Sequence, residues 1–279
     1  MIGGMGTVGL IAGKEIRDAV RNRWVAAATL LLAALAFVLT FLGSAPTGTL
    51  EAKPLAVTVV SLASLTIFLV PLIALLLSYD AFAGEVQRGT LLLLLTYPTT
   101  RWRILLGKFL GHTAVIAIAT IIGYGAAGLA AGLATGGADP ASWRAFVALL
   151  ATSVMLGSVF IAMAYVASLS VRESSTAAGL AIGLWLFFVL LFDLGLLGLL
   201  VSTRGQISPT IFPYLLLLDP ADIFRLFNLS AFDNVRVFSG LAGLSGGMQL
   251  SPGLLLGALT AWIAVPLGWS AWLFRRREL

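Results

Sequence analysis

Residues 57–79 read VTVVSLASLTIFLVPLIALLLSY and contain no charged side chain. A helix needs about 20 predominantly apolar residues to cross the hydrocarbon core of a bilayer, and this stretch is long enough. Comparable apolar runs lie at about residues 24–42, 104–134, 143–169, 177–201 and 252–274. The sequence therefore predicts an all-α membrane protein with six transmembrane helices.

The composition of the whole chain agrees with this prediction. Of its 279 residues, 59% are hydrophobic and 10% are charged, and the mean hydropathy is +1.03. Soluble domains carry about 25% charged residues, so this chain has too little polar surface for a soluble fold. Disordered chains are poor in apolar residues. A transmembrane β-barrel is disfavoured because its strands alternate polar and apolar residues.

The Lys and Arg residues set the expected orientation. With both termini in the cytoplasm, 12 of them fall on the cytoplasmic side and 5 on the other side, as the positive-inside rule requires. The net charge of +5 is explained in the same way, so we expect no nucleic-acid partner. The expected segments are a cytoplasmic amphipathic helix on the membrane surface (1–23), transmembrane helices 1–5 with cytoplasmic loops (24–201), an outer loop with short helices (202–251), and transmembrane helix 6 with a basic cytoplasmic tail (252–279).

The connection between the second and third spans carries a distinct pattern. A run of five leucines, 91–95, lies between charged corners, and Pro98 should end any helix built on that run. Such a helix suits docking to a cytosolic protein, although a plain connector with lipid-reaching charges fits equally well. The turn between the fourth and fifth spans, with Arg172, Glu173 and Ser174, is short and polar and lies on the same side.

The expected outer loop contains a second helix signal. Asp219 can cap the helix, Pro220 can occupy its first position, and Asp222 places an acid in its first turn. The helix either rests on lipid or offers a docking surface to an outer protein. The candidate residues for that contact are Asp219, Asp222, Phe224, Arg225 and Phe227.

Few ionisable residues lie within the spans. A carboxylate in hydrocarbon costs about 2.5–3.5 kcal/mol, so Asp193 in the fifth span is a candidate transmembrane pathway residue or interhelical partner. Alternatively, it lies near the outer end and reaches water or pairs with an outer arginine. The single histidine, His112, is expected to be a structural hydrogen-bonding group. The chain has no cysteine, which excludes a His/Cys zinc or copper site, and we expect no metal site.

The sequence also lacks the motifs of an enzyme. It has no G-x-x-x-x-G-K-[ST] phosphate-binding loop and no Ser/His/Asp or paired-carboxylate arrangement. We therefore expect no catalytic residues and no cofactor in this chain. Ion-coupled transport usually needs chains of intramembrane carboxylates, which are scarce here. The pattern points to a transporter driven by a separate subunit that hydrolyses ATP.

Several of these stretches resemble the ABC-2 class of ATP-binding cassette transporter permeases. The resemblance covers nearly the whole chain and is carried by Glu85, Gly89-Thr90-Leu91, Pro98, Arg101 and Gly107-Lys108. It implies a homodimeric permease in a bacterial inner membrane that binds two copies of a cytosolic ATPase subunit, which holds ATP and Mg. The ATPase-coupling residues that it implies are Glu85, Arg88, Gly89, Thr90, Leu91, Arg101, Arg172, Glu173 and Ser174.

Within this class, residues 215–230 are similar to permeases that serve copper-centre maturation of nitrous-oxide reductase in denitrification. This similarity implies a periplasmic copper-maturation partner facing residues 215–230. The work done would be transport of a cargo, with a sulfur species as the candidate, or mechanical action on that partner. Because the chain has no cysteine, copper is not expected to pass through a thiolate relay. The alternative function is a self-contained secondary transporter or channel that uses Asp193.

Overall fold

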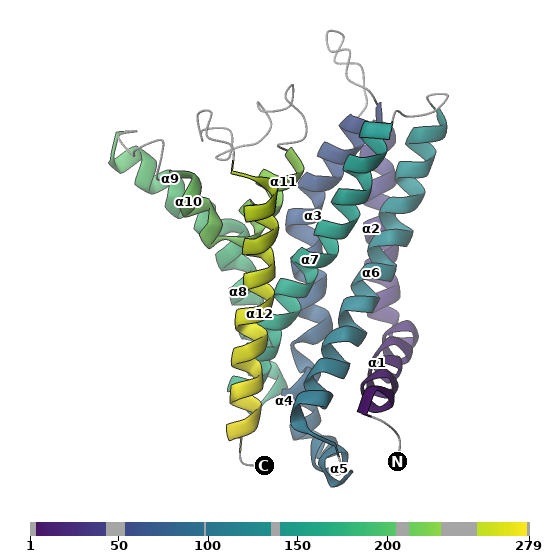
Figure 1. Ribbon diagram of the computed structural model, residues 1–279, viewed down its shortest axis with the longest axis vertical. Helices are drawn as coiled ribbons and strands as arrows, with labels where there is room; N and C mark the ends of the chain where they lie inside the picture. Colours follow the sequence, from purple (N-terminus) through teal and green to yellow (C-terminus); the bar gives the residue numbers. More distant parts are fainter. Residues whose placement is uncertain are drawn as a thin grey trace.

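The computed structural model describes residues 4–42, 54–97, 99–134, 140–204, 212–229 and 250–277, and these residues are almost all helical. Figure 1 shows the long helices side by side in an elongated bundle. They are α2 (Arg23–Leu42), α3 (Pro54–Ser78), α6 (Arg101–Ala134), α7 (Pro140–Ser170) and α12 (Pro252–Arg276). The helix pair α8 (Ser174–Leu186) and α9 (Phe192–Ser202), joined by the π-helical turn Phe187–Leu191, leans away from the bundle.

The predicted membrane spans are confirmed as five or six. Among the described residues, five helical stretches are long and apolar enough to cross a membrane: Thr58–Gln87, Arg101–Leu133, Pro140–Ser170, Ser174–Ser202 and Pro252–Arg276. A sixth is present if α2 and the preceding α1 (Gly4–Arg21), which meet at a bend of 71°, are counted together as one span.

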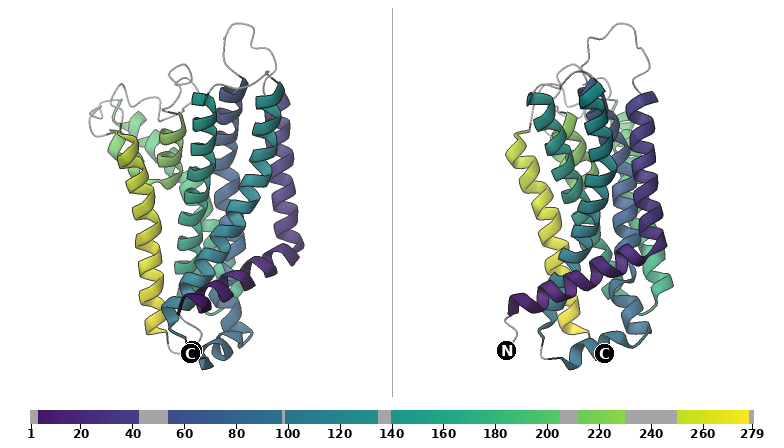
Figure 2. Two further views of the ribbon diagram at one scale, coloured as in Figure 1. Left: turned by 45° about the vertical axis from the view of Figure 1, so that its right-hand side comes forward. Right: turned by 90° about the vertical axis from the view of Figure 1, so that its right-hand side faces the viewer.

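One end of the bundle, here called the α5 end, gathers several short elements. It holds α4 (Asp80–Gln87), α5 (Thr90–Thr96), the end of α12 and the helix α1, which lies across the bundle (Figure 2). α1 crosses α6 closely because two glycines of α6 face it: a Cβ at Gly107 would lie 2.7 Å from Ile11 Cβ, and one at Gly111 would lie 3.0 Å from the Ala12 carbonyl oxygen. The predicted amphipathic helix therefore packs one face against α6.

The core of the bundle is centred on α7. About 67% of the most apolar window of Pro140–Ser170 is buried, against 11% for Ser174–Ser202. The buried Thr66 hydroxyl of α3 lies 2.9 Å from the Tyr124 hydroxyl of α6, which is the kind of pairing that a hydrocarbon environment favours. The fifth span is thus the one that the rest of this chain covers least.

The predicted helix at Pro220 is present as α11 (Pro220–Leu229), after α10 (Phe212–Leu215) and the 3-10 turn Leu216–Leu218. Its cap is confirmed, since the Ala221 amide donates to Asp219 Oδ1 at 2.9 Å. α11 packs inside the bundle against α3, α7 and α12, and the Asn228 amide donates to Thr152 Oγ1 of α7 at 3.0 Å. The rest of the expected outer loop, 205–211 and 230–249, lies outside the described residues, as does Pro98.

Candidate coupling site

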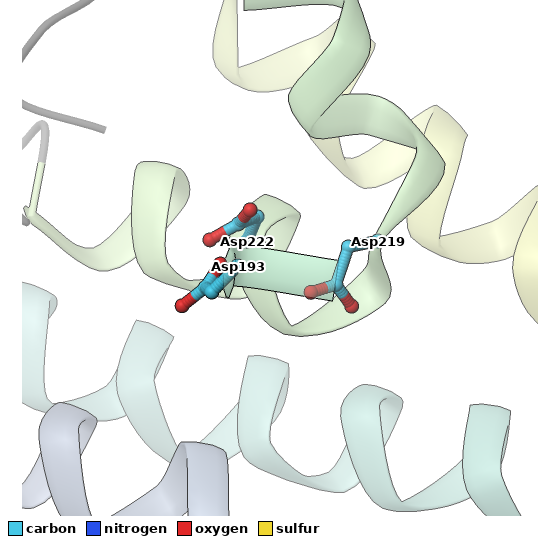
Figure 3. Close-up of side chains that lie close together, drawn as sticks. All are labelled: Asp193, Asp219 and Asp222. Atoms are coloured by element: carbon cyan, nitrogen blue, oxygen red, sulfur yellow. The ribbon is translucent and has the colours of Figure 1, made fainter. Parts of the chain in front are cut away.

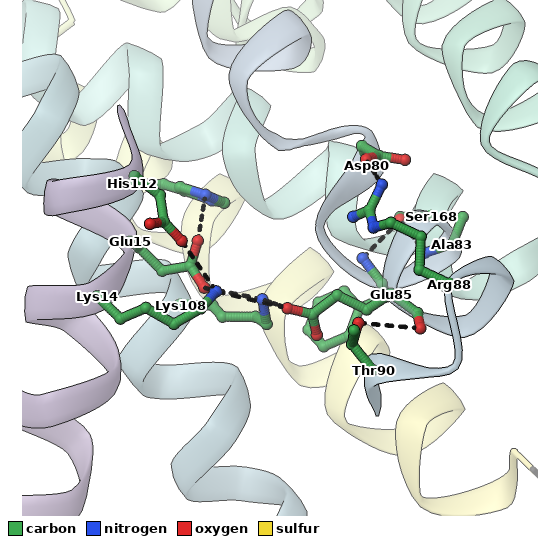
Figure 4. Close-up of polar contacts among 12 residues, drawn as sticks. Lys14, Glu15, Asp80, Ala83, Glu85, Arg88, Thr90, Lys108, His112 and Ser168 are labelled. Carbon is green, nitrogen blue, oxygen red and sulfur yellow. Dashed lines mark hydrogen bonds and ion pairs between the residues drawn. The ribbon is translucent and has the colours of Figure 1, made fainter. Parts of the chain in front are cut away.

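A group of charged side chains joins three elements at the α5 end (Figure 4). It consists of Glu15 of α1, Glu85 of α4, and Lys108 and His112 of α6, and is here called the charge cluster. Lys108 Nζ lies 2.9 Å from Glu15 Oε1 and 2.7 Å from Glu85 Oε1. The ammonium group of Lys108 therefore connects α1, which lies across the bundle, to the short helix α4.

Burial makes these two ion pairs consequential. The Lys108 side chain is only 3% exposed, and Glu15 and Glu85 are about as well covered. Removing charges from water costs several kcal/mol per ion, and close pairing has to offset that cost. Lys14, which is half exposed, adds a second positive charge 3.3 Å from Glu15 Oε1. Two lysines thus balance two carboxylates.

The cluster continues into the bundle through His112. His112 Nε2 lies 3.4 Å from Glu15 Oε2, and Nδ1 lies 2.8 Å from the buried Tyr165 hydroxyl of α7. Since a carboxylate can only accept, we assign the proton to Nε2, so that Nδ1 accepts from the tyrosine. Burial works to raise the pKa of the Glu15 carboxyl, but the hydrogen bond from His112 and the charge of Lys108 hold that pKa well below its usual range. Both ring nitrogens of His112 therefore have a partner in this structure.

α4 is held in place from α7. The Ser168 hydroxyl oxygen accepts hydrogen bonds from the backbone amides of Phe82, at 3.1 Å, and Ala83, at 3.0 Å. These amides belong to the first turn of α4 and have no partner within the helix. These two hydrogen bonds anchor α4, the helix that carries Glu85, to α7. Glu85 Oε2 is buried and has no hydrogen-bond partner among the described residues.

The chain reverses from α4 into α5 at Gly89, whose φ of +71° favours glycine. The Thr90 hydroxyl donates back to the Glu85 carbonyl oxygen at 3.3 Å. The predicted short helix on the leucine run is therefore present. Within it, Leu91 is buried, while Leu92 and Leu93 are 53% and 65% exposed. The tip of the α5 end thus presents apolar side chains away from the bundle.

The α7–α8 turn lies beside α4. The Ser174 hydroxyl donates to Asp80 Oδ1, and the Ser174 amide donates to Gln87 Oε1 at 3.3 Å. Arg88 Nη1 donates to the other oxygen of Asp80 at 3.0 Å. Asp80 thereby links both segments that the sequence marked for an ATPase contact, and Arg172 and Glu173 of the turn are exposed.

Arg101 lies in the same region but points elsewhere. Its Nη1 donates to the carbonyl oxygens of Phe274, Arg275 and Arg277 at the end of α12, with the last two at 3.1 and 3.0 Å. A cation at a helix C-terminus satisfies carbonyls that lack intrahelical partners. The Arg101 side chain is therefore occupied in anchoring α12 to the start of α6.

The residues expected to face an outer partner lie on α11 and on the turn before it. Asp219, Asp222 and Phe224 are buried in the bundle, and Phe227 is partly buried. The first three side chains are covered because the amphipathic helix α11 packs against α3, α7 and α12 of its own chain. Asp193 is paired with Arg225 of α11: its Oδ2 lies 3.3 Å from Arg225 Nη2.

The contacts of Glu15, Lys108 and Tyr165 were not predicted from the sequence. One signal was available: Lys108 and His112 are four residues apart, so both lie on one face of an otherwise apolar helix. The partner of that polar face could not be read from the sequence. It follows from the crossing of α1 over α6, which brings Glu15 of a distant segment against them.

Comparisons with known proteins agree with this architecture. Residues 10–279 match the family described as ABC-2 family transporter protein. The chain is 48% identical, over 98% of its length and 99% of the relative's, to a protein of Stutzerimonas stutzeri named probable ABC transporter permease protein NosY. It is 47% identical, over 99% and 100% of the two lengths, to the protein of that name in Pseudomonas aeruginosa. The chain therefore belongs to the ABC-2 transporter family, in which it is a multi-pass permease subunit and not a catalytic one.

Proposed function

We propose that this permease converts ATP hydrolysis in a cytosolic partner into movement of its membrane helices through the charge cluster. The observation that carries the proposal is the buried Lys108, shared between Glu85 of α4 and Glu15 of α1. A displacement of α4 has to move or break this pairing, and breaking it leaves a buried charge uncompensated. Two arrangements with different pairing are what a coupled conformational change needs.

The α5 end faces the cytoplasm in this proposal. The support is the positive-inside count, because most Lys and Arg residues lie in the segments that meet at this end. It also places α1 on the cytoplasmic surface and the α11 end towards the periplasm of a bacterial inner membrane. Both described ends of the chain then lie on the cytoplasmic side (Figure 1).

The cytosolic ATPase docks on α5 and the neighbouring α7–α8 turn. Leu92 and Leu93 supply exposed apolar area at the tip, and Arg172 and Glu173 supply exposed charges beside it. Asp80 connects the two surfaces through Ser174 and Arg88, so both can move as one unit. The proposed coupling set is Glu85, Arg88, Gly89, Thr90, Leu91, Arg101, Arg172, Glu173 and Ser174.

A second copy of the chain covers the fifth span. Only 11% of the apolar window of Ser174–Ser202 is buried within one copy. Gly179 and Gly183 are four residues apart on its exposed face, and no atom outside the helix lies within 4 Å of a Cβ at either position. Small residues at this spacing let membrane helices approach closely. These features support a homodimer with the lipid bilayer around it.

The cellular role follows from the relatives and from the sequence resemblance. Both relatives are named NosY, and we infer a NosF-like cytosolic ATPase and a NosD-like periplasmic partner, acting in copper-centre maturation of nitrous-oxide reductase. The ATPase subunit supplies ATP and Mg. A sulfur species is the proposed cargo, with mechanical work on the periplasmic partner as the other form of output.

Co-purification tests this assignment. The chain is extracted from native membranes in mild detergent, captured by a tag, and its companions are identified by mass spectrometry. We expect a protein with a phosphate-binding loop and a secreted periplasmic protein. Recovery of the chain alone, with crosslinking also failing to trap a partner, would overturn the proposal and favour a self-contained transporter that uses Asp193.

ATPase measurements on the purified complex test the coupling step. Glu85→Gln keeps the shape of the side chain but weakens the pairing with Lys108, so hydrolysis by the complex should fall severalfold. Asp18→Asn, an exposed acid on α1, is the control and should leave the rate unchanged. An unaltered rate in a Glu85→Gln complex that still contains the ATPase would contradict the role of the charge cluster.

A further inference from the structure

A second charged group lies towards the opposite end of the bundle from the charge cluster, where α9 meets the turn before α11. It contains Asp193 of α9, Asp219 of the turn, and Asp222 and Arg225 of α11. One carboxylate oxygen from each of the three aspartates lies within 4.8 Å of the others. Figure 3 shows the three side chains, with Asp193 and Asp222 beside each other and Asp219 a little apart from them.

Arg225 does not satisfy this group. Its Nη1 lies 2.6 Å from Asp222 Oδ1, and its Nη2 lies 3.3 Å from Asp193 Oδ2. The other oxygen of each carboxylate, Asp222 Oδ2 and Asp193 Oδ1, is buried and has no hydrogen-bond partner among the described residues. The Asp222 side chain has no exposed surface. Two neighbouring carboxylates of this group therefore each keep one buried oxygen atom without a partner among the described residues.

The charge count gives the size of the deficit. When all three aspartates are ionised, they and the one arginine carry a net charge of −2. Buried charge of this size in an apolar surrounding is costly unless it is compensated. A single divalent cation neutralises it and supplies the missing partner for both orphaned oxygens. Carboxylate oxygens without nitrogen or sulfur ligands suit hard cations and not Cu(I).

We propose that Asp193, Asp219 and Asp222 bind one hard divalent cation of the Mg²⁺, Mn²⁺ or Ca²⁺ class. The cation would join the fifth span to α11 and hold α11 in its position in the bundle. Asp193 is 29% exposed, which leaves one side open for entry and for water to complete the coordination. No sequence motif predicts this site, because Asp193 is more than twenty residues from the other two aspartates.

Mn²⁺ is the probe for the test. The full chain, purified in detergent and stripped with EDTA, is titrated with Mn²⁺ while electron paramagnetic resonance follows the signal of the free ion. The wild type should remove about one Mn²⁺ per chain from solution, and excess Mg²⁺ or Ca²⁺ should release it. Asp193→Asn should weaken binding at least tenfold, while the exposed control Asp18→Asn should bind as the wild type does.

Two results would overturn the proposal. One is equal Mn²⁺ binding by the wild type and by Asp193→Asn, which would place the ion elsewhere. The other is the absence of stoichiometric Mn²⁺ binding by a wild type that is monodisperse and helical. In that case the melting temperature is measured against pH. A pH dependence that is lost in Asp193→Asn would show that Asp193 and Asp222 share a proton instead of binding a cation. Because Asp222 is fully buried, Asp222→Asn is used only where circular dichroism shows that it folds.

Discussion

At the scale of single residues, Lys108 should matter more than any exposed lysine. Lys108→Met leaves two buried carboxylates without their shared cation, and breaking a buried pair in this way costs about 3–5 kcal/mol. Thermal unfolding of the detergent-purified chain should show a clearly lowered melting temperature. Lys14→Met is the matched control, because Lys14 contacts the same carboxylates but is half exposed, and exposed pairs contribute about 0–1 kcal/mol.

The direction of the effect can be checked by removing the carboxylates as well. Adding Glu15→Gln and Glu85→Gln to Lys108→Met removes the uncompensated charges, so part of the lost stability should return. If Lys108→Met alone has the same melting temperature as the wild type, Lys108 is not a buried counter-charge, and the coupling proposal loses its central contact.

At the scale of elements, the crossing of α1 over α6 depends on Gly107. A Cβ there would lie 2.7 Å from Ile11 Cβ and 3.1 Å from the Val8 carbonyl oxygen, so Gly107→Val should push α1 away. Overpacking of this kind costs about 1–3 kcal/mol. At Gly125 on the same helix an added Cβ has no neighbouring atom within 4 Å, so Gly125→Val should change the melting temperature little. Equal melting temperatures for the two variants would contradict the close crossing.

The exposed face of α5 makes a separate prediction about assembly. Leu93 is 65% exposed, so Leu93→Glu should leave the fold of the chain intact but sharply reduce capture of the cytosolic ATPase. Val20→Glu, at an equally exposed aliphatic position on α1, is the control and should keep normal capture. Quantitative mass spectrometry of the tagged chain measures both, and undiminished capture by Leu93→Glu would move the docking surface elsewhere.

The elements themselves were largely predictable, because each depends on signals within a short stretch. Uncharged apolar runs predicted the spans, and Asp219-Pro220 predicted the start of α11, whose cap is confirmed. The burial of α11 was not predictable, since its apolar face would suit lipid, a partner or the bundle equally well. Only the packing against α3, α7 and α12 decides among these.

At the scale of the whole molecule, both polar clusters were hidden from the sequence for one reason. Each joins residues that are far apart along the chain: Glu15 and Lys108 in the charge cluster, and Asp193 and Asp222 in the proposed cation site. Hydropathy detects a charge within an apolar run but not which distant charge it meets. The exposed face of the fifth span was not predictable for a related reason, because the sequence of one chain does not show which partner covers that face.

The uncovered fifth span leads to the last prediction. Gly179, Gly183 and Leu186 follow one another at helical spacing on the exposed face, and an isologous two-fold interface brings a residue near its axis against its own copy. The chain has no cysteine, so Leu186→Cys supplies one thiol per copy. Mild oxidation in native membranes should then give a dimer band on a non-reducing gel. Ile121→Cys, on an exposed position of α6, controls for random collisions; equal crosslinking at both positions would mean that α8 does not form the interface.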